Sequence, residues 1–255
     1  MNNEELKNIA KLKQKKFRDE SGQFLIEGAH LIDECNKSKY YKRNIIKIIL
    51  RTDFKDERLL GRLRHIESEY LSPKDFNKIS ETENPQGIIA VTGKADNLPH
   101  HEGKIICALD NINDPGNLGT ILRTCWWFGI ENVITGRDSV EVFNSKVIRA
   151  SQGAVFNLLI KEKVNLKEEL IGKSNEGYTV LLTDLSAINS ISNTTFGKDK
   201  KYVIVFGNEA NGISKGIKEI PEFEKIKIDS YTKCESLNVA SSAAIILHEI
   251  IKGTN

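Results

Sequence analysis

The sequence predicts an α/β protein in two parts, a smaller first part and a larger second part built on a parallel sheet. Three observations support this prediction. The second half alternates short β-branched runs with helical segments, which is typical of parallel sheets with helices on both faces. Polar loops follow three of those runs. The first part is basic, because residues 1–64 hold 16 Lys and Arg against 10 Asp and Glu, although the 255-residue chain has a net charge of only +2.

The composition excludes several classes of protein. At 39% hydrophobic residues the chain can fill a core, which disordered proteins cannot. Its longest uncharged apolar runs, 203–206 and 243–247, are far shorter than the ~20 residues of a membrane span. Residues 1–10 are polar, unlike a secretory signal. We therefore expect a cytoplasmic protein that does not span a membrane.

The cysteines and histidines do not predict a metal centre. No CxxC pair or HExxH motif occurs, so we expect reduced, buried thiols and no metal. His100–His101 reads as loop, with a weak metal site left open. The four cysteines are Cys35, Cys107, Cys125 and Cys234.

The first part is predicted to be a small α/β unit over residues 1–95, of a size that is normal for a binding module. A surplus of cations suits a polyanionic partner, although a solvated basic surface explains it equally well. A linker over 96–103 follows, marked by Pro99. The expected elements are a basic amphipathic helix over 3–18, a strand over 24–26, a helix over 28–37, a strand over 45–50, helices over 56–66 and 73–79, and a strand over 88–92.

The second part, residues 104–255, is predicted to be the parallel-sheet domain. In such sheets, ligands bind beyond the carboxyl ends of strands, which selects the loops after Leu109, Phe206 and Ile228. The expected strands are 104–109, 132–134, 155–160, 179–183, 202–206 and 225–228, and the expected helices are 117–128, 144–151, 165–173 and 236–251.

The first loop, Asp110–Gly119, leads into a helix. Pro115-Gly116 fixes a turn, and Asn117 is expected to cap the helix. Arg123 follows about two turns in. It is either a surface residue or, beside the Asn and Asp side chains of the loop, a cation positioned for phosphate.

The second loop holds polar residues between Gly207 and Gly212. Glycine lets a ligand approach the backbone closely, although a plain connecting turn is the alternative. No GxxxxGK[ST] or GxGxxG motif occurs in the chain, which argues against ATP and NAD.

The third loop runs from Ile228 to Asn238. Ser236 and Asn238 stand at the start of a helix, where such residues commonly serve only as caps. The helix itself is apolar enough to be core or interface.

Taken together, the three loops resemble the three motifs of the SpoU/TrmH family, which are 2′-O-ribose RNA methyltransferases of the SPOUT superfamily. The resemblance rests on Asn117-Leu118-Gly119 with Arg123, on Gly207-Asn208-Glu209 with Gly212, and on Ser236-Leu237-Asn238-Val239, and the segment 146–154 is similar to the family's linking element. The sequence departs from the family at Ile228-Asp229-Ser230, where many members have Ile-Pro-Met.

The first part also resembles a known domain. Lys15–Arg18, Phe24–Gly28 and Asn84–Gly87 are similar to the substrate-binding domain fused to many members, which itself resembles a small ribosomal protein. The resemblance implies an RNA partner, with rRNA favoured over tRNA.

For the fold, the resemblance implies a C-terminal segment threaded as a deep trefoil knot and a homodimer. The helix over 236–251 and the run Trp126-Trp127-Phe128 could supply the dimer interface. For the aromatic run, ordinary core is the favoured interpretation, and base stacking the least favoured.

For the site, the resemblance implies methyl transfer from S-adenosylmethionine to a ribose 2′-hydroxyl. Arg123 would stabilise the developing alkoxide, with an RNA phosphate as a proton relay, and Asn117 would orient Arg123 or the ribose. Glu209 and Asn238 would hold the loops and the nucleotide, with Ser236 assisting. The backbones of Gly207, Ile228 and Leu237, with Thr183 as a further candidate, would hold the cofactor.

Two other functions stay open. The chain could be an RNA-binding assembly factor that has lost catalysis, although an intact set of site residues argues against this. It could also methylate a base nitrogen, which requires a carboxylate as proton acceptor, whereas an Arg in the first loop suits ribose chemistry better.

Overall fold

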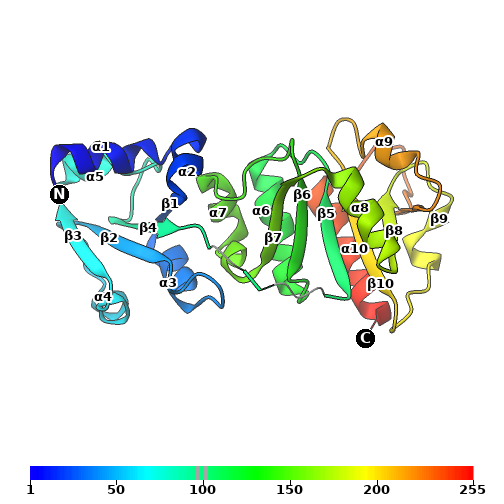
Figure 1. Ribbon diagram of the computed structural model, residues 1–255, viewed down its shortest axis with the longest axis horizontal. Helices are drawn as coiled ribbons and strands as arrows, with labels where there is room; N and C mark the ends of the chain where they lie inside the picture. The colour runs from blue at the N-terminus through cyan, green and yellow to red at the C-terminus, as the bar shows by residue number, and fades with distance from the viewer. Residues whose placement is uncertain (96–97, 100–102, 255) are drawn as a thin grey trace. The chain divides into compact units, whose positions relative to one another are not determined.

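The structure is a computed structural model that describes residues 1–95, 98–99 and 103–254 (Figure 1). It divides into two compact units. One comprises Met1–Leu98 with Phe143–Asn157, and the other Pro99–Val142 with Leu158–Asn255. The sequence-based division placed 143–157 in the second part, whereas its contacts group it with the first. The linker predicted over 96–103 falls largely outside the described residues, as does His100–His101.

The first unit holds a four-stranded mixed sheet with the order β1-β4-β2-β3. Only β2 and β3 are parallel. Its elements are α1 (Asn3–Lys11), α2 (Lys15–Ser21), β1 (Gln23–Glu27), α3 (Ala29–Lys37), β2 (Ile45–Arg51), α4 (Glu57–Leu63), β3 (Glu67–Leu71), α5 (Pro73–Ile79), β4 (Ile88–Gly93), α7 (Ser145–Ser151) and the 3₁₀ turn η1 (Ala154–Asn157).

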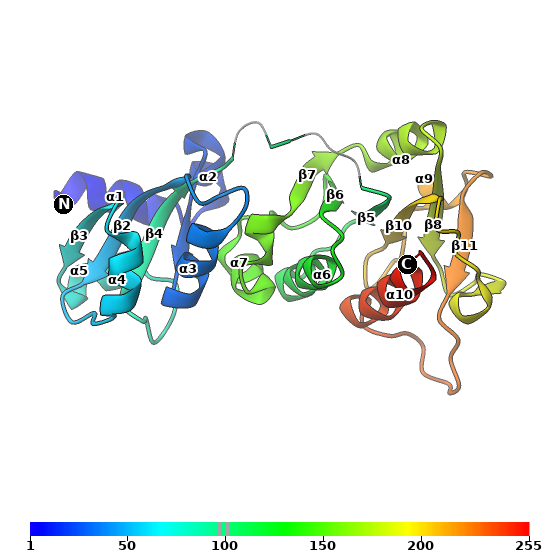
Figure 2. The ribbon, with the colours of Figure 1, turned by 90° about the horizontal axis from the view of Figure 1, so that it is seen from below.

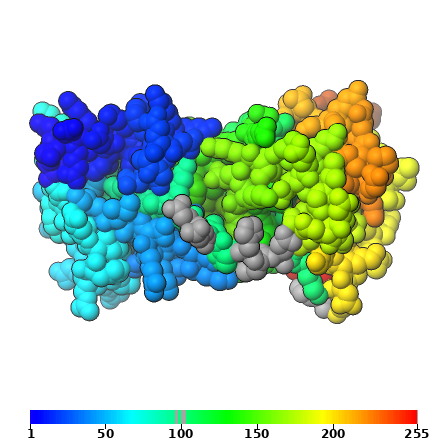
Figure 3. All heavy atoms as spheres, viewed as in Figure 1, coloured from blue at the N-terminus to red at the C-terminus, as the bar shows by residue number. Residues whose placement is uncertain are grey.

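Helices α1 and α5 cover one face of this sheet. Leu6 and Ile9 of α1 and Phe76 of α5 pack on alternate residues of the central strands, among them Ile49 and Ile89. Figure 3 shows α1 and α2, in dark blue, at the surface of this unit. The sheet residues of opposite parity face the side that carries α3.

Two predictions for the first unit are wrong. The single helix expected over 3–18 is broken between α1 and α2, where buried Arg18 donates hydrogen bonds to the backbone oxygens of Leu12 (2.8 Å) and Lys13 (2.8 Å). Strand β3 was missed because its side chains are mostly polar. Its Glu67 and Glu69 form ion pairs with Lys47 of β2, at 2.9 and 3.3 Å.

The second unit is built on a seven-stranded sheet with the order β7-β6-β5-β10-β8-β11-β9, in which every neighbouring pair is parallel. Its elements are β5 (Ile105–Leu109), α6 (Pro115–Trp127), β6 (Asn132–Gly136), β7 (Leu159–Val164), α8 (Leu166–Asn175), β8 (Tyr178–Thr183), β9 (Asn189–Ser190), the 3₁₀ turn η2 (Ile191–Asn193), β10 (Lys201–Phe206), α9 (Lys215–Lys218), β11 (Glu224–Lys227) and α10 (Val239–Thr254).

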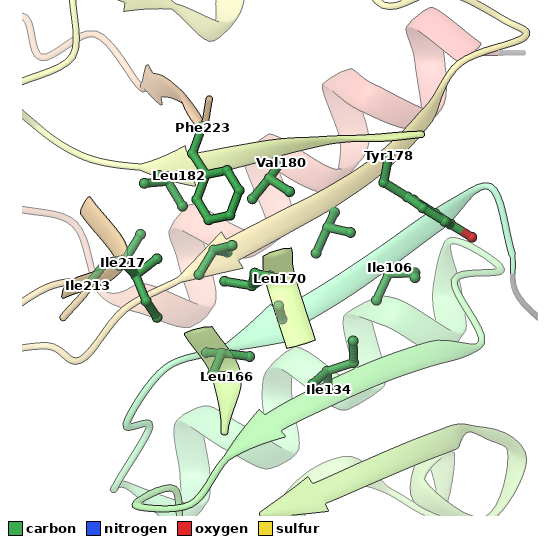
Figure 4. Close-up of a cluster of buried hydrophobic side chains, with 13 residues drawn as sticks. Ile106, Ile134, Leu166, Leu170, Tyr178, Val180, Leu182, Ile213, Ile217 and Phe223 are labelled. Carbon is green, nitrogen blue, oxygen red and sulfur yellow. The ribbon is translucent and has the colours of Figure 1, made fainter. Parts of the chain in front are cut away.

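Helices cover both faces of this sheet, as predicted. Leu166 and Leu170 of α8 and Ile217 of α9 pack on one face against β-strand residues such as Val180 and Ile134 (Figure 4). Figure 2 shows α6 and α10 side by side on the other face, and the two helices pack against each other. The strand predicted over 155–160 is instead the turn η1 followed by β7, and the final helix begins at Val239 rather than at 236.

The aromatic run at the end of α6 is not ordinary core. Trp127 is 82% exposed and Trp126 is 40% exposed. Phe128 is half-buried, with its ring centroid 5.9 Å from that of His248 on α10. The exposed tryptophans therefore leave an apolar patch on the α6 side of this unit.

Within the described residues, no helix combines the length and the apolar character that crossing a membrane requires. Of the four free cysteines, Cys35, Cys107 and Cys125 are buried as expected, whereas Cys234 is exposed. In the part of the chain that the structure describes, no group of three or more His, Cys, Asp or Glu side chains is arranged to hold a metal ion.

Candidate functional site

The first two candidate loops leave adjacent strands of the second sheet. Strands β5 and β10 pair in register, with Leu109 opposite Phe206, so Asp110 and Gly207 emerge side by side. The backbone N–H of Asp110 donates to the oxygen of Phe206 at 2.8 Å. The first and second loops therefore begin at the same edge of the sheet, as the parallel topology predicts.

Two side chains join these loops further. The buried carboxylate of Asp110 accepts a hydrogen bond from the backbone N–H of Ser214 at 2.6 Å and another from the Ser214 hydroxyl. The amide of Asn208 donates to the backbone oxygen of Asn111 at 2.9 Å. Sequence reasoning did not single out Asp110 and Ser214. The available signal was an Asp directly after a buried strand, at the edge where the loops meet.

Three predicted site residues form one chain of hydrogen bonds across all three loops. The Asn238 amide donates to the side-chain oxygen of Asn117 at 2.9 Å, and the Asn117 amide donates to the Glu209 carboxylate at 2.7 Å. Because Asn117 uses both its donor and its acceptor, it bridges the second loop and the third.

The capping roles differ from the prediction. Asp114, not Asn117, caps α6, since its carboxylate accepts from the Asn117 backbone N–H at 2.7 Å and Pro115 occupies the first helical position. The Asn117 side chain is thereby left available for the bridge. Asn238 does cap α10, accepting from the N–H groups of Ala240 (2.9 Å) and Ser241 (3.2 Å), while its amide reaches Asn117.

A cavity of about 660 Å³ lies beside the hydrogen-bonded residues Asn238, Asn117 and Glu209, between the second and third loops. All four predicted cofactor-binding residues line it, namely Thr183, Gly207, Ile228 and Leu237. Glu209 and Ser236 line it as well. Small-molecule sites typically measure about 300–1,000 Å³, with mostly apolar walls and a few polar groups.

Gly207 is required by the close approach of its own loop. A Cβ built at this position would lie 2.2 Å from the nitrogen of Ile213 and 2.3 Å from the carbonyl carbon of Gly212. The backbones of Asn208 and Gly212 pair across the same loop, at 2.8 and 3.1 Å. Any side chain at 207 would push this wall of the cavity out of place.

A half-buried ion pair fixes another wall of the cavity. Asp184 and Lys218 both line it, and their charged groups lie 3.1 Å apart. Burial raises the pKa of Asp184, but hydrogen bonds from the N–H and hydroxyl of Ser186, together with Lys218, outweigh burial and hold the pKa below its ordinary value of 3.8.

Asp229, which stands where many family members have proline, has a hydrogen-bond partner in the structure. Its carboxylate accepts a hydrogen bond from the Ser190 hydroxyl at 2.5 Å. Strand β9, which ends at Ser190, pairs with β11, so this bond ties the third loop to the sheet edge at its start. A proline at 229 has no side-chain acceptor, so the tie is a feature of this sequence.

Arg123 and Ser236 are not joined to the hydrogen-bonded chain. Arg123 is exposed on α6 and has no hydrogen bond or ion pair within residues 1–95, 98–99 and 103–254. Along the helix axis it lies about 9 Å beyond Asn117, at 1.5 Å per residue. Ser236 is exposed, and its backbone oxygen accepts a weak bond from the Cys234 thiol at 3.5 Å.

The cavity fits a small ligand with a polar and an apolar part. Phe206, Ile226 and Ile246 supply apolar wall, while Asn208, Glu209 and Asp184 supply polar groups. Asn117 forms the bridge at the start of α6, and Arg123 is an exposed cation further along the same helix. Such an arrangement can hold a cofactor beside a polyanionic substrate.

Comparison with known proteins finds a family match for each part of the chain. Residues 104–248 match the SpoU rRNA Methylase family, and residues 3–90 match the MRM3-like substrate binding domain. The chain is 32% identical over 249 residues to the 23S rRNA (guanosine(2553)-2′-O)-methyltransferase RlmP of Bacillus subtilis, covering 97% of this chain and 96% of that protein.

Two solved structures resemble the whole chain. The AdoMet-bound rRNA methyltransferase of Sinorhizobium meliloti has a TM-score of 0.83 at 26% identity, covering 98% of this chain and 95% of that one. The SpoU methyltransferase AviRb of Streptomyces viridochromogenes, at 21% identity, has a TM-score of 0.85, covers 98% of each chain and shows the same fold. With its methylase match spanning more than half of its length, the chain belongs to the SpoU rRNA methylase family.

Proposed function

We propose that this protein transfers a methyl group from S-adenosylmethionine to a ribose 2′-hydroxyl of ribosomal RNA. The observation that carries the proposal is the hydrogen-bonded chain Asn238–Asn117–Glu209, which brings three loops together beside a cavity of about 660 Å³. Family membership and the relationship to RlmP support the same reaction.

The cavity residues would hold the cofactor, which supplies an activated methyl group on a sulfonium. Gly207, Ile228 and Leu237 would contact it mainly through their backbones, and Thr183 would supply wall rather than a donor, because its hydroxyl donates to the Val205 oxygen at 2.9 Å. Shape therefore matters more than side-chain chemistry at these positions, which explains the glycine at 207.

The chemistry left to the protein is to align the ribose and to ease the loss of its proton. A ribose hydroxyl is hardly ionised at neutral pH, so a cation beside the oxygen stabilises the alkoxide as its charge develops. Arg123 takes that role, with an RNA phosphate as proton relay. Its freedom from ion pairs among the described residues leaves the guanidinium available for RNA.

The bridge would act by positioning. Asn117 fixes the start of α6 against the second and third loops, and so sets where Arg123 stands relative to the cavity. Glu209 and Asn238 hold the two ends of the bridge. Ser236, on the cavity wall, would contact the nucleotide.

The remaining features of the family belong to the same proposal. The C-terminal segment would thread through a loop as a deep trefoil knot. Two copies would dimerise through α6 and α10, where exposed Trp126 and Trp127 and 40%-exposed Ile245 leave apolar surface. Residues 1–95 would bind RNA, with rRNA favoured over tRNA, and the protein would act in the cytoplasm.

The test is transfer of tritiated methyl to rRNA from cells that lack this protein, followed by mapping of the labelled position. We expect label on one ribose 2′-oxygen. Label on a base nitrogen would make the chain a base methyltransferase. Cofactor binding in calorimetry without transfer to any rRNA would contradict catalysis and favour an RNA-binding assembly factor.

A further inference from the structure

The loop between α3 and β2 is a basic turn. Residues 38–44 carry Lys39, Lys42 and Arg43 and no carboxylate, and Lys37 ends the helix before them. Lys37 is held by Asp33 on its own helix at 2.6 Å. The exposed neighbours Lys42 and Arg43 have no hydrogen bond or ion pair in the part of the chain that the structure describes.

Several cations of the first unit are already held by partners within it. Arg18 is buried and donates to backbone oxygens, and Lys13 donates to the Ser80 oxygen at 2.6 Å. Lys47 contacts three carboxylates, and Lys94 pairs with Asp19 at 3.0 Å. These cations are used within the fold, whereas Lys42 and Arg43 are available, as are exposed Lys7, Lys15, Arg58 and Arg64 elsewhere in residues 1–64. What sets Lys42 and Arg43 apart is that they are neighbours on one turn.

The basic turn is anchored in the core of the first unit by the side chain of Tyr41. The Tyr41 ring is buried, with its centroid 5.7 Å from that of Phe156, 5.9 Å from that of Phe143 and 6.3 Å from that of Phe24. All three phenylalanines belong to the same compact unit. A tyrosine anchored in this way fixes the residues that follow it directly.

Backbone bonds complete the support. The Ser38 hydroxyl accepts from the Tyr41 N–H at 3.0 Å, and the Asn44 N–H donates to the Tyr41 oxygen at 2.8 Å. On the other side, the Lys39 N–H donates to the Asn157 side chain at 3.1 Å. The turn needs little ordering before it binds, which lowers the entropic cost of binding.

We propose that this basic turn, Ser38–Asn44, is a phosphate-contacting surface for the RNA substrate, with Lys42 and Arg43 as the contacting residues. The inference rests on the proposed function and adds to it where on the first unit the RNA backbone lies. Half-buried Tyr40, with the Lys39 ammonium 5.0 Å from its ring centroid, gives the same turn an aromatic face beside its cations. Such contacts position RNA without reading its sequence.

The test compares two double variants of the full chain. Lys42→Ala with Arg43→Ala removes the proposed contacts. Lys7→Ala with Lys74→Ala removes the same net charge from exposed positions on α1 and α5. The probe is protein-free 23S rRNA from cells lacking the protein, bound over a series of KCl concentrations. Calorimetry with S-adenosylmethionine and a thermal melt check that each variant is folded.

We expect the 42/43 variant to bind the rRNA roughly tenfold more weakly. The slope of log K against log [salt] should become less steep by about 1.4 to 1.8, from the counterions of two phosphate contacts. The control should stay within about twofold of the wild type. Unchanged affinity and slope in the 42/43 variant, or equal losses in both variants, would overturn the proposal. If the wild type binds rRNA but methylates nothing, the proposed reaction fails, while the binding comparison still tests the basic turn.

Discussion

The side-chain amide of Asn238 donates a hydrogen bond to the side-chain oxygen of Asn117, 121 residues earlier in the chain. This contact, with the bond from Asn117 to Glu209, is the point at which the three loops become one site.

Replacing Asn117 with Ala removes both bonds of the bridge. We expect methyl transfer to fall by about tenfold or more, because the start of α6 is no longer fixed against the other loops. The free energy of unfolding should fall by only about 2 kcal/mol, because each of the two lost bonds typically contributes about 1 kcal/mol. Single-turnover methyl transfer and urea unfolding measure the two effects.

A matched control is Asn144→Ala, which removes a helix-capping bond to the Lys146 N–H (2.9 Å) in the first unit. It should cost similar stability. If both variants lose activity only in proportion to their stability, Asn117 has a structural role alone.

Gly207→Ala should damage the cavity. The new Cβ would meet backbone atoms at 2.2 and 2.3 Å, so the loop must move. We expect the Kd for S-adenosylmethionine in calorimetry to rise by at least about tenfold, equivalent to 1.4 kcal/mol.

Gly216→Ala is the control, because a Cβ there meets nothing within 4 Å on the short helix α9. That variant should bind the cofactor like the wild type. Normal cofactor affinity in Gly207→Ala would separate this loop from the binding site.

Asp184→Asn tests the ion pair in the cavity wall. The pKa of Asp184 is held below its ordinary 3.8 in the folded protein, so the ionised carboxylate stabilises the fold above that value. This contribution is lost as the pH falls through the folded pKa. We expect the variant to be less stable than the wild type at pH 7 and the difference to vanish once the pH lies below the lowered pKa of the folded state.

Urea unfolding at stepped pH measures this difference. Asp199→Asn, at an exposed carboxylate with no ion pair among the described residues, should match the wild type at each pH. A stability difference for Asp184→Asn that is constant with pH would show that the ionised carboxylate is not its cause.

The sequence predicted the parallel sheet, its helices on both faces and the three loops, because these follow from local patterns and from the topology of parallel strands. It did not predict which polar side chain caps α6 and which one joins the loops. The Asp114 carboxylate caps α6 and releases the Asn117 side chain, and only the tertiary arrangement decides between the two. In a similar way, strand β3 has no apolar pattern by which the sequence could reveal it. It tolerates its two glutamates because Lys47 on the neighbouring strand forms ion pairs with both.

Residues 143–157 show a further limit of local patterns. Val155 and Phe156 look like the start of a strand, yet they are buried in a 3₁₀ turn within the first unit. The Trp126-Trp127 pair has the composition of a core but lies exposed. The position of an apolar residue in the fold, which its local pattern does not contain, decides both cases.

Arg123→Ala tests the central claim most directly, with two readouts on one preparation. We expect methyl transfer to rRNA to fall by roughly a hundredfold or more, as when a group that stabilises a developing oxyanion is removed. The Kd for S-adenosylmethionine should stay unchanged, because Arg123 is not among the residues that line the cavity. Near wild-type methyl transfer by this variant would contradict the account.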